Sequence, residues 1–238
     1  MKVTIQKASE RGKADHGWLH ANYYFSFSNY HNPEKIHFGA LRVLNDDIIA
    51  GGGGFPTHPH DNMEIVTIPF SGALSHQDNT GGAGIIKAGD VQIMSAGTGV
   101  QHSEKNASGT ETVNLFQLWV FPKKRNITPR YDQRTFNIND RVNKWQVVVS
   151  PNEKDEALWI NQDSIFALTK LEAGKTLAYE NSFKGNGVYL VVINGSVKLN
   201  DTILERRDAA GITETDRFSI TASEDAELLM VEVPMTFH

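Results

Sequence analysis

Two short motifs, His58-Pro59-His60 and His102-Ser103-Glu104, hold the residues best suited to do chemistry. In each motif the two outer side chains are two residues apart, and such side chains leave the same face of a β-strand. Two such strands facing each other across a barrel would bring three imidazoles and one carboxylate to one point. That donor set binds a divalent metal and leaves coordination positions open. The motifs therefore predict a metal site of the kind found in enzymes.

The alternative is that these are ordinary strand histidines in a polar barrel mouth, which is the better interpretation of any single histidine. Burying three imidazoles and a carboxylate together without a cation would be costly, because each polar group needs a partner and the charge needs compensation. Taken as a unit, the four residues favour a metal site.

Composition limits the classes of protein to consider. The 238 residues, 39% of them hydrophobic, suffice for one large all-β domain or two smaller ones, and we favour two. Cysteine is absent, so disulfides, iron–sulfur clusters and thiol catalysis are excluded, and a metal must be held by His, Asp or Glu.

Charge and hydropathy argue against nucleic acid and membrane partners. The net charge is −5, and the one basic run, residues 123–125, follows Pro122 where a loop is expected. We therefore expect no direct nucleic-acid contact. The N-terminus has no apolar signal region, and no stretch approaches the ~18 apolar residues of a membrane span. The sequence predicts a soluble cytoplasmic protein.

Strand signals dominate the chain, and no segment keeps a 3.6-residue apolar period, so we expect an all-β fold of barrels or sandwiches with few short helices. The expected strands are β-branched or aromatic segments bounded by turn residues, at 38–44, 64–70, 113–120, 145–150, 187–193 and 226–233. Turn residues at 79–82, 87–90 and 184–187 predict hairpins. The polar, proline-containing stretch 122–144 is expected to connect two domains, residues 1–134 and 135–238.

At the histidine motifs the sequence resembles the cupin superfamily, and in detail its pirin family. The first cupin motif, G-x5-H-x-H-x3,4-E-x6-G, is matched by Gly52, His58, His60 and Glu64, with Gly72 one residue late, as in pirins. The second, G-x5-P-x-G-x2-H-x3-N, is matched by Gly89, Gly97, His102 and Asn106, but Ser95 replaces the proline and the histidine comes two residues late. The pirin form, G-D-x-Q-x-M-x-A-G-x-G-x-x-H-S-E, fits residues 89–104 at every fixed position.

Segments 16–19, 25–30 and 38–47 are similar to bacterial pirin-like proteins that act as quercetin 2,3-dioxygenases. The resemblance is dense in the first half of the chain and covers the second half in outline. It implies a bicupin, meaning two β-barrel domains of the jelly-roll type. The N-terminal domain would hold one divalent metal through His58, His60, His102 and Glu104.

The resemblance also implies that the C-terminal domain holds no metal. Glu180 and Ser182 fall where the two histidines of the first motif would be, and no histidine lies between His102 and His238. For the N-terminal metal, Fe(II) is our first choice. Cu(II), Ni(II) and Mn(II) are alternatives, because imidazole and carboxylate ligands suit all four.

Two carboxylates compete for the metal. Most cupins use the glutamate of the first motif, here Glu64, which shares a strand face with His58 and His60 if the strand is regular. Pirins use the glutamate of the second motif, so we assign Glu104 as the ligand. Glu64 is then expected to orient an imidazole N–H from outside the ligand set.

The activity implied by the resemblance is ring opening of a flavonol such as quercetin with O2 and release of carbon monoxide. Glu104 or Glu64 would take the proton of the substrate hydroxyl. The competing hypothesis is a regulatory pirin whose metal switches a protein–protein contact without turnover. A different reaction at the same site, such as isomerisation or decarboxylation, is a third, and fold alone does not choose among them.

The remaining histidines receive structural interpretations. His76 and Asp78 repeat the one-residue spacing beside a turn, and we expect a solvent-facing hairpin pair rather than a second metal site. Near the N-terminus, four histidines lie among aromatic residues: His16, His20, His31 and His37, with Trp18, Tyr23, Tyr24, Phe25, Phe27, Tyr30 and Phe38. Such density usually means core or interface packing, and the alternative is an entrance for a flat aromatic substrate.

Overall fold

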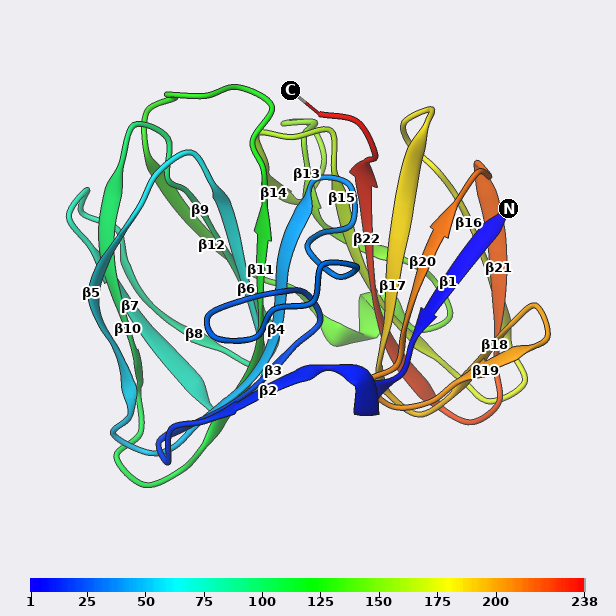
Figure 1. Cartoon of the computed structure of the whole chain (residues 1–238), viewed down its shortest axis with the longest axis horizontal. Helices are drawn as coiled ribbons and strands as arrows, with labels where there is room; N and C mark the ends of the chain where they lie inside the picture. The colour runs from blue at the N-terminus through cyan, green and yellow to red at the C-terminus, as the bar shows by residue number, and fades with distance from the viewer. Residues whose placement is uncertain (238) are drawn as a thin grey trace.

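Strands make up almost all the regular structure in the computed structural model, which describes residues 1–237 (Figure 1). Within these residues the only helices are two 3₁₀ turns, η1 (Ala8–Glu10) and η2 (Ile138–Arg141). The predicted all-β class with few short helices is confirmed. No helix in the described part of the chain has the length and apolarity needed to span a membrane.

The N-terminal half consists of a large and a small sheet. The seven-stranded sheet has the order β12-β9-β6-β11-β4-β3-β2, and the four-stranded sheet has the order β5-β10-β7-β8. Their strands are β2 (Gly12–Asp15), β3 (Leu19–Tyr23), β4 (Leu41–Ile49), β5 (Gly54–His60), β6 (Glu64–Ser71), β7 (Ala73–Asp78), β8 (Ala83–Lys87), β9 (Asp90–Ser95), β10 (Val100–Asn106), β11 (Val113–Val120) and β12 (Arg130–Thr135).

The C-terminal half repeats this plan. Its seven-stranded sheet has the order β1-β20-β17-β22-β15-β13-β14, and its four-stranded sheet has the order β16-β21-β18-β19. Their strands are β1 (Lys2–Gln6), β13 (Gln146–Ser150), β14 (Leu158–Trp159), β15 (Ile165–Leu171), β16 (Thr176–Glu180), β17 (Asn186–Asn194), β18 (Val197–Leu199), β19 (Thr202–Leu204), β20 (Ala209–Thr213), β21 (Arg217–Ala222) and β22 (Ala226–Pro234).

The two large sheets face each other in the middle of the molecule, and the small sheets form its outer flanks (Figure 1). One apolar cluster joins the halves, with Phe116 and Leu44 from the first and Phe166 and Val231 from the second. A separate apolar cluster fills the C-terminal barrel, and smaller ones line the N-terminal barrel. The expected bicupin architecture is therefore present.

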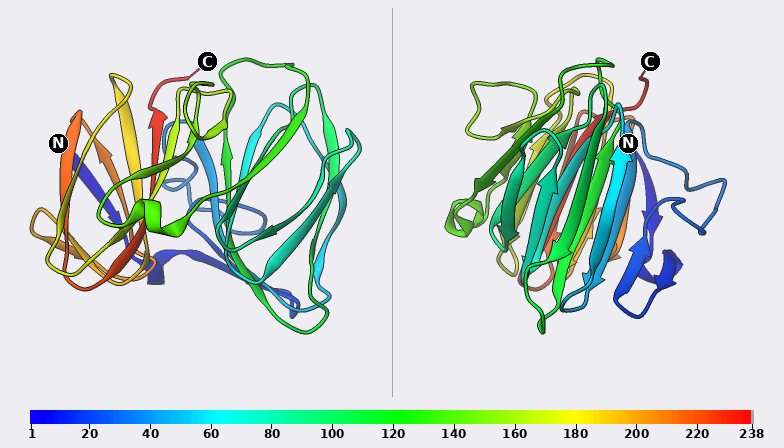
Figure 2. Two further views of the ribbon diagram at one scale, coloured as in Figure 1. Left: turned by 180° about the vertical axis from the view of Figure 1, so that it is seen from behind. Right: turned by 90° about the vertical axis from the view of Figure 1, so that its left-hand side faces the viewer.

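The domain boundaries differ from those expected. β1 pairs with β20, so the first strand of the chain belongs to the C-terminal sheet and not to a domain of residues 1–134. The stretch expected to connect the domains contains β12, which pairs with β9. The chain crosses between the halves after β12, through η2, as the rear view in Figure 2 shows.

The strands predicted around 64–70, 113–120, 145–150, 187–193 and 226–233 are present within about one residue, whereas the one predicted at 38–44 is β4 and runs to Ile49. Of the three predicted hairpins, the one at 79–82 joins the paired strands β7 and β8. The turn at 87–90 connects β8 to β9, which lie in different sheets, and the turn at 184–187 precedes β17 after β16 of another sheet. Turn residues marked the reversals correctly, but strand pairing depends on distant segments.

Candidate metal centre

Three of the predicted ligands meet on one face of the small N-terminal sheet. β5 and β10 pair antiparallel with His102 opposite His58, and His60 lies two residues along β5. One ring nitrogen from each histidine lies within 4.8 Å of the others. The expectation that the two motifs face each other across the barrel was wrong, because β5 and β10 are neighbours in the same sheet. The one-residue spacing still directs each pair to a common face.

A hydrogen bond leaves the inner nitrogen of His58 free. His58 Nδ1 lies 2.8 Å from the carbonyl oxygen of Pro56, to which it donates. Its Nε2 therefore carries a lone pair, and this atom is 2.9 Å from Nε2 of His102. His102 Nε2 either donates its proton to this lone pair or, with its proton on Nδ1, presents a second lone pair that a cation can share. The arrangement fits a divalent metal ion.

His76 and Asp78 are buried, which overturns the prediction of a solvent-facing pair. Both side chains have no exposed surface, and His76 Nε2 lies 3.1 Å from Asp78 Oδ2. Since Nε2–H donates to Asp78, Nδ1 of His76 is an acceptor, and it lies 3.4 Å from Nδ1 of His102. His102 donates either through Nδ1–H to His76 or through Nε2–H to His58, and the first tautomer leaves its Nε2 free for a cation. A carboxylate and a second histidine thus fix the orientation of a candidate ligand.

Glu104 lines the same cavity as the three histidines and is 3% exposed. Its two carboxylate oxygens accept from Nε2 of Gln117 at 3.2 and 2.9 Å. It also belongs to a second group of potential ligand atoms within 4.8 Å, with His76 and His102. Burial raises the pKa of Glu104 to about 7, and the Gln117 hydrogen bond opposes that rise.

Glu64 does not lie beside the histidines, contrary to expectation. β5 ends at His60, and Asn62 has a left-handed φ of 45° in the turn that follows, so Glu64 begins β6 in the other sheet. Its Oε2 accepts from Ser95 Oγ at 2.8 Å and from the backbone N–H of Asn161, in the C-terminal half, at 3.2 Å. Burial raises its pKa to about 7. Glu64 joins the two halves and, among residues 1–237, accepts no hydrogen bond from an imidazole N–H.

His60 and His102 are neutral at pH 7, the form in which imidazole binds metals. Burial, followed by the effect of nearby His58, lowers the pKa of His60 to about 4. The same two causes, with smaller contributions from His60 and His76, lower the pKa of His102 to about 3. A cation entering the site therefore displaces no proton from these two rings.

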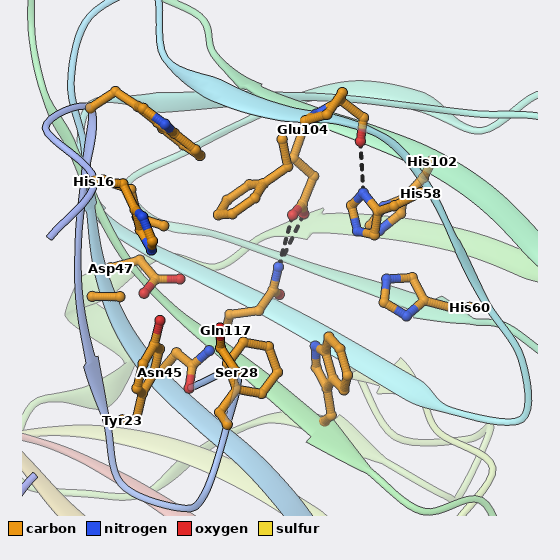
Figure 3. A pocket seen from close by; sticks show the side chains of 17 residues that line it. His16, Tyr23, Ser28, Asn45, Asp47, His58, His60, His102, Glu104 and Gln117 are labelled. Carbon is orange, nitrogen blue, oxygen red and sulfur yellow. Dashed lines mark hydrogen bonds between the residues drawn. The ribbon is translucent and has the colours of Figure 1, made fainter. Parts of the chain in front are cut away.

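The histidines open onto a cavity of about 440 Å³ inside the N-terminal barrel (Figure 3). Its lining combines aromatic and apolar walls with polar groups: His16, Trp18, Leu19, Ala21, Tyr23, Phe27, Ser28, Asn45, Asp47, Phe55, Pro56, His58, His60, His102, Glu104, Gln117 and Trp119. The Trp119 ring packs edge-on against His60, with centroids 4.9 Å apart. A flat aromatic molecule suits such a cavity.

The N-terminal aromatic residues divide between the two expected roles. His16, Trp18, Tyr23 and Phe27 line the cavity. Tyr24, Phe25 and Phe38 pack in or against the central cluster between the halves. His20 and His31 are exposed. The packing interpretation is confirmed for Tyr24, Phe25 and Phe38, and an entrance for an aromatic substrate stays a prediction for the residues that line the cavity.

Sequence reasoning missed Asn45 and Asp47, which line the cavity away from His58, His60 and His102 (Figure 3). Both are buried, at 4% and 5% exposure. Burial, followed by the charges of Asp46 and Glu104, raises the pKa of Asp47 well above its usual range. The available signal was a run of three polar residues, 45–47, inside a segment that otherwise reads as a buried strand.

Comparison with known proteins places the chain in a family. The Pirin family model matches residues 4–120, and the model of the quercetinase C-terminal cupin domain matches residues 147–233. A quercetin 2,3-dioxygenase of Escherichia coli K12 is 41% identical over 98% of this chain and 99% of its own length. A pirin-like protein of Caulobacter vibrioides is 45% identical over 93% and 95% of the two chains.

Two solved structures share the whole fold. The crystal structure of YhhW from E. coli superposes with a TM-score of 0.94 at 40% identity and covers 100% of both chains. A second structure of the same bacterial pirin, in complex with nickel(II), gives a TM-score of 0.93 at 40% identity over 99% of this chain and 100% of that one. The resemblance seen in the histidine motifs is confirmed, and the chain belongs to the pirin family of the cupin superfamily.

Proposed function

We propose that this protein is a metal-dependent dioxygenase that opens the heterocycle of a flavonol such as quercetin with O2 and releases carbon monoxide. The observation that carries the proposal is the joining of a three-histidine cluster to a cavity with aromatic walls. The dioxygenase name of the E. coli relative, which is similar over nearly its full length, supports the same activity.

We assign His58, His60 and His102 as the metal ligands, with Glu104 as the fourth donor. Imidazole nitrogens and one carboxylate suit Fe(II), Ni(II), Cu(II) and Mn(II), and Fe(II) remains our first choice. The nickel(II) complex of the E. coli pirin supports a site that accepts divalent ions of this series. When bound, the ion supplies Lewis-acid and redox chemistry at a substrate oxygen.

The protein's own groups orient the substrate and move its proton. Trp18, Phe27 and Phe55 offer aromatic surfaces against which flat rings can pack. Glu104 is the carboxylate that lines the cavity next to the histidines, and we assign it as acceptor of the flavonol 3-hydroxyl proton. Gln117 holds the carboxylate of Glu104 in place through two contacts. Glu64 lies outside the cavity, so we no longer assign it a catalytic role.

The test is anaerobic purification with metal analysis, followed by assays of the Fe(II)-loaded protein with quercetin and O2. We expect O2 uptake with stoichiometric release of carbon monoxide. His58→Ala should abolish both. His20→Ala is the matched control, because its side chain is 55% exposed and does not line the cavity.

Metal bound at full occupancy without O2 uptake or carbon monoxide release would contradict the dioxygenase. It would favour the alternative of a metal-switched regulatory protein that acts through protein–protein contacts. Turnover that persists in His58→Ala would contradict the assignment of the metal site.

A further inference from the structure

Asn45 and Asp47 project into the cavity from β4, with Asp46 between them on the opposite face. This alternation follows from the strand geometry. Asp46 is well paired, with Arg11 Nη1 at 2.9 Å and Arg207 Nε at 3.3 Å from its Oδ2. Asp47, its neighbour in sequence, has no ion pair within the described residues. Of these two adjacent buried carboxylates, Asp46 is neutralised by two arginines and Asp47 by none of the described residues.

Three cavity-lining residues have a buried polar atom that lacks a hydrogen-bond partner within residues 1–237. They are the acceptors Asn45 Oδ1 and Asp47 Oδ1, and the donor Trp119 Nε1. Buried polar groups are nearly always paired in folded proteins, so an unpaired group needs an explanation. Three in one cavity indicate a ligand that supplies their partners.

The positions of these atoms describe the chemistry of that ligand. Trp119 packs on His60, so its N–H lies at the metal end and is suited to a ligand oxygen. Asn45 and Asp47 lie away from His58, His60 and His102, beyond Gln117 and on the side of His16, as Figure 3 shows. No lysine or arginine lines the cavity in the described part of the chain. The far end therefore accepts hydrogen-bond donors and disfavours anionic groups.

We propose that Asn45 and Asp47 form a specificity subsite that accepts hydrogen bonds from hydroxyl groups on the part of an aromatic substrate farthest from His58, His60 and His102. Trp119 Nε1 donates to an oxygen of the same substrate near the metal. The inference rests on the proposed flavonol function and adds to it. The preferred substrate is a polyhydroxylated ring system, because an unhydroxylated one leaves buried acceptors unpaired.

The test measures binding without turnover, by isothermal titration calorimetry of the Ni(II)-loaded protein under nitrogen. The two probes are quercetin and 3-hydroxyflavone, which keeps the 3-hydroxyl and the 4-carbonyl but lacks the other hydroxyls. We expect wild-type protein to bind quercetin roughly 10- to 100-fold more tightly than 3-hydroxyflavone. Asn45→Leu and Asp47→Leu should each reduce this ratio toward one.

Two further variants separate the subsite from general effects. Trp119→Phe keeps the aromatic ring but removes the donor, so both probes should bind more weakly with an unchanged ratio. Asp132→Leu removes an exposed carboxylate that does not line the cavity, and should leave both Kd values unchanged. The Tm of the metal-free Asn45→Leu and Asp47→Leu proteins should equal or exceed that of the wild type, because each removes an unpaired buried group.

A wild-type ratio near one, or a ratio that persists in both leucine variants, would overturn the subsite while leaving flavonol binding intact. A lowered Tm of both metal-free variants would also overturn it, since the side chains would then serve the fold. If the wild type binds neither flavonol, the proposed function fails and this inference fails with it.

Discussion

The two halves of the molecule share one sheet plan but fill it with different side chains. In the N-terminal half the small sheet is ordered β5-β10-β7-β8, and the strands β16-β21-β18-β19 repeat that order in the C-terminal half. In the first, His102 pairs with His58, whereas in the second Phe218 pairs with Tyr179. The small N-terminal sheet therefore carries imidazoles at this pair, and the small C-terminal sheet carries the aromatic rings of Tyr179 and Phe218.

The two halves also differ in how the hydrogen bonds of a buried carboxylate are satisfied. Glu232, in the C-terminal half, has no exposed surface and accepts hydrogen bonds from Tyr179 Oη, from the backbone N–H groups of Ser182 and Phe183 and from Asn186 Nδ2. Asp47 in the N-terminal half has a buried oxygen without a partner. Glu232 is thus fully paired within the C-terminal barrel, whereas Asp47 has an unpaired oxygen in a residue that lines the N-terminal cavity. Such unpaired groups cost stability and are retained where binding needs them.

Removing a candidate metal ligand should have the largest effect, because it takes away the feature that distinguishes the N-terminal barrel. His102→Ala takes one imidazole from the cluster, and we expect a loss of roughly 3 kcal/mol or more in metal binding, at least about 100-fold in affinity. Metal analysis of the purified protein and metal titration followed by Tm measure the change. His20→Ala should retain wild-type metal content, and equal metal content in both variants would contradict the site.

Replacing Glu232, and separately Asp47, tests the contrast between a fully paired and a partly unpaired buried carboxylate. Glu232→Leu leaves four donors without an acceptor, so its free energy of unfolding should fall by roughly 3 kcal/mol. Asp47→Leu removes a group with an unpaired oxygen and should cost nothing. Urea denaturation of the metal-free proteins measures both. Equal losses in the two variants would remove the distinction between the barrels.

Glu64 provides a test of the contact between the halves. Its pKa is about 7 in the folded protein, against an ordinary value of 4.5. A raised carboxyl pKa stabilises the fold fully below about pH 4.5, and this stabilisation is lost as pH rises through 7. Relative to Glu64→Gln, the wild-type free energy of unfolding should therefore fall by about 2–3 kcal/mol between pH 4.5 and 7.5. Parallel pH profiles for the two proteins would refute the assignment.

The smallest effect is expected at the residues behind His102. His76→Phe keeps the ring that stacks on Tyr131, 4.7 Å away, but removes the acceptor for His102 Nδ1–H. Metal affinity should fall roughly 10- to 100-fold without being abolished. His76→Gln can accept from His102 and donate to Asp78, and should recover part of the loss. Unchanged affinity in His76→Phe would show that the pair does not orient the ligand.

The sequence by itself determined the local features of this protein. Alternating β-branched and aromatic residues predicted the strands, and the bounds of β11 agree with the predicted 113–120. The one-residue spacing placed each histidine pair on one strand face, because side-chain direction in a strand depends only on neighbouring residues. Each motif's shared strand face was predictable for this reason, whereas the pairing of β5 with β10 that brings His102 to His58 was not.

Only the tertiary structure decided which segments meet. β1 and β12 occupy equivalent edge positions in the two large sheets, yet each lies beside strands distant in sequence. Neither His76 nor Glu64 lies where we expected. His76 is buried against His102, and Glu64 accepts a hydrogen bond from Asn161 in the other half. Asn45 and Asp47 became cavity residues because β4 lies inside the large sheet and one of its faces lines the cavity. Side-chain partners depend on long-range register, and no local pattern encodes that register.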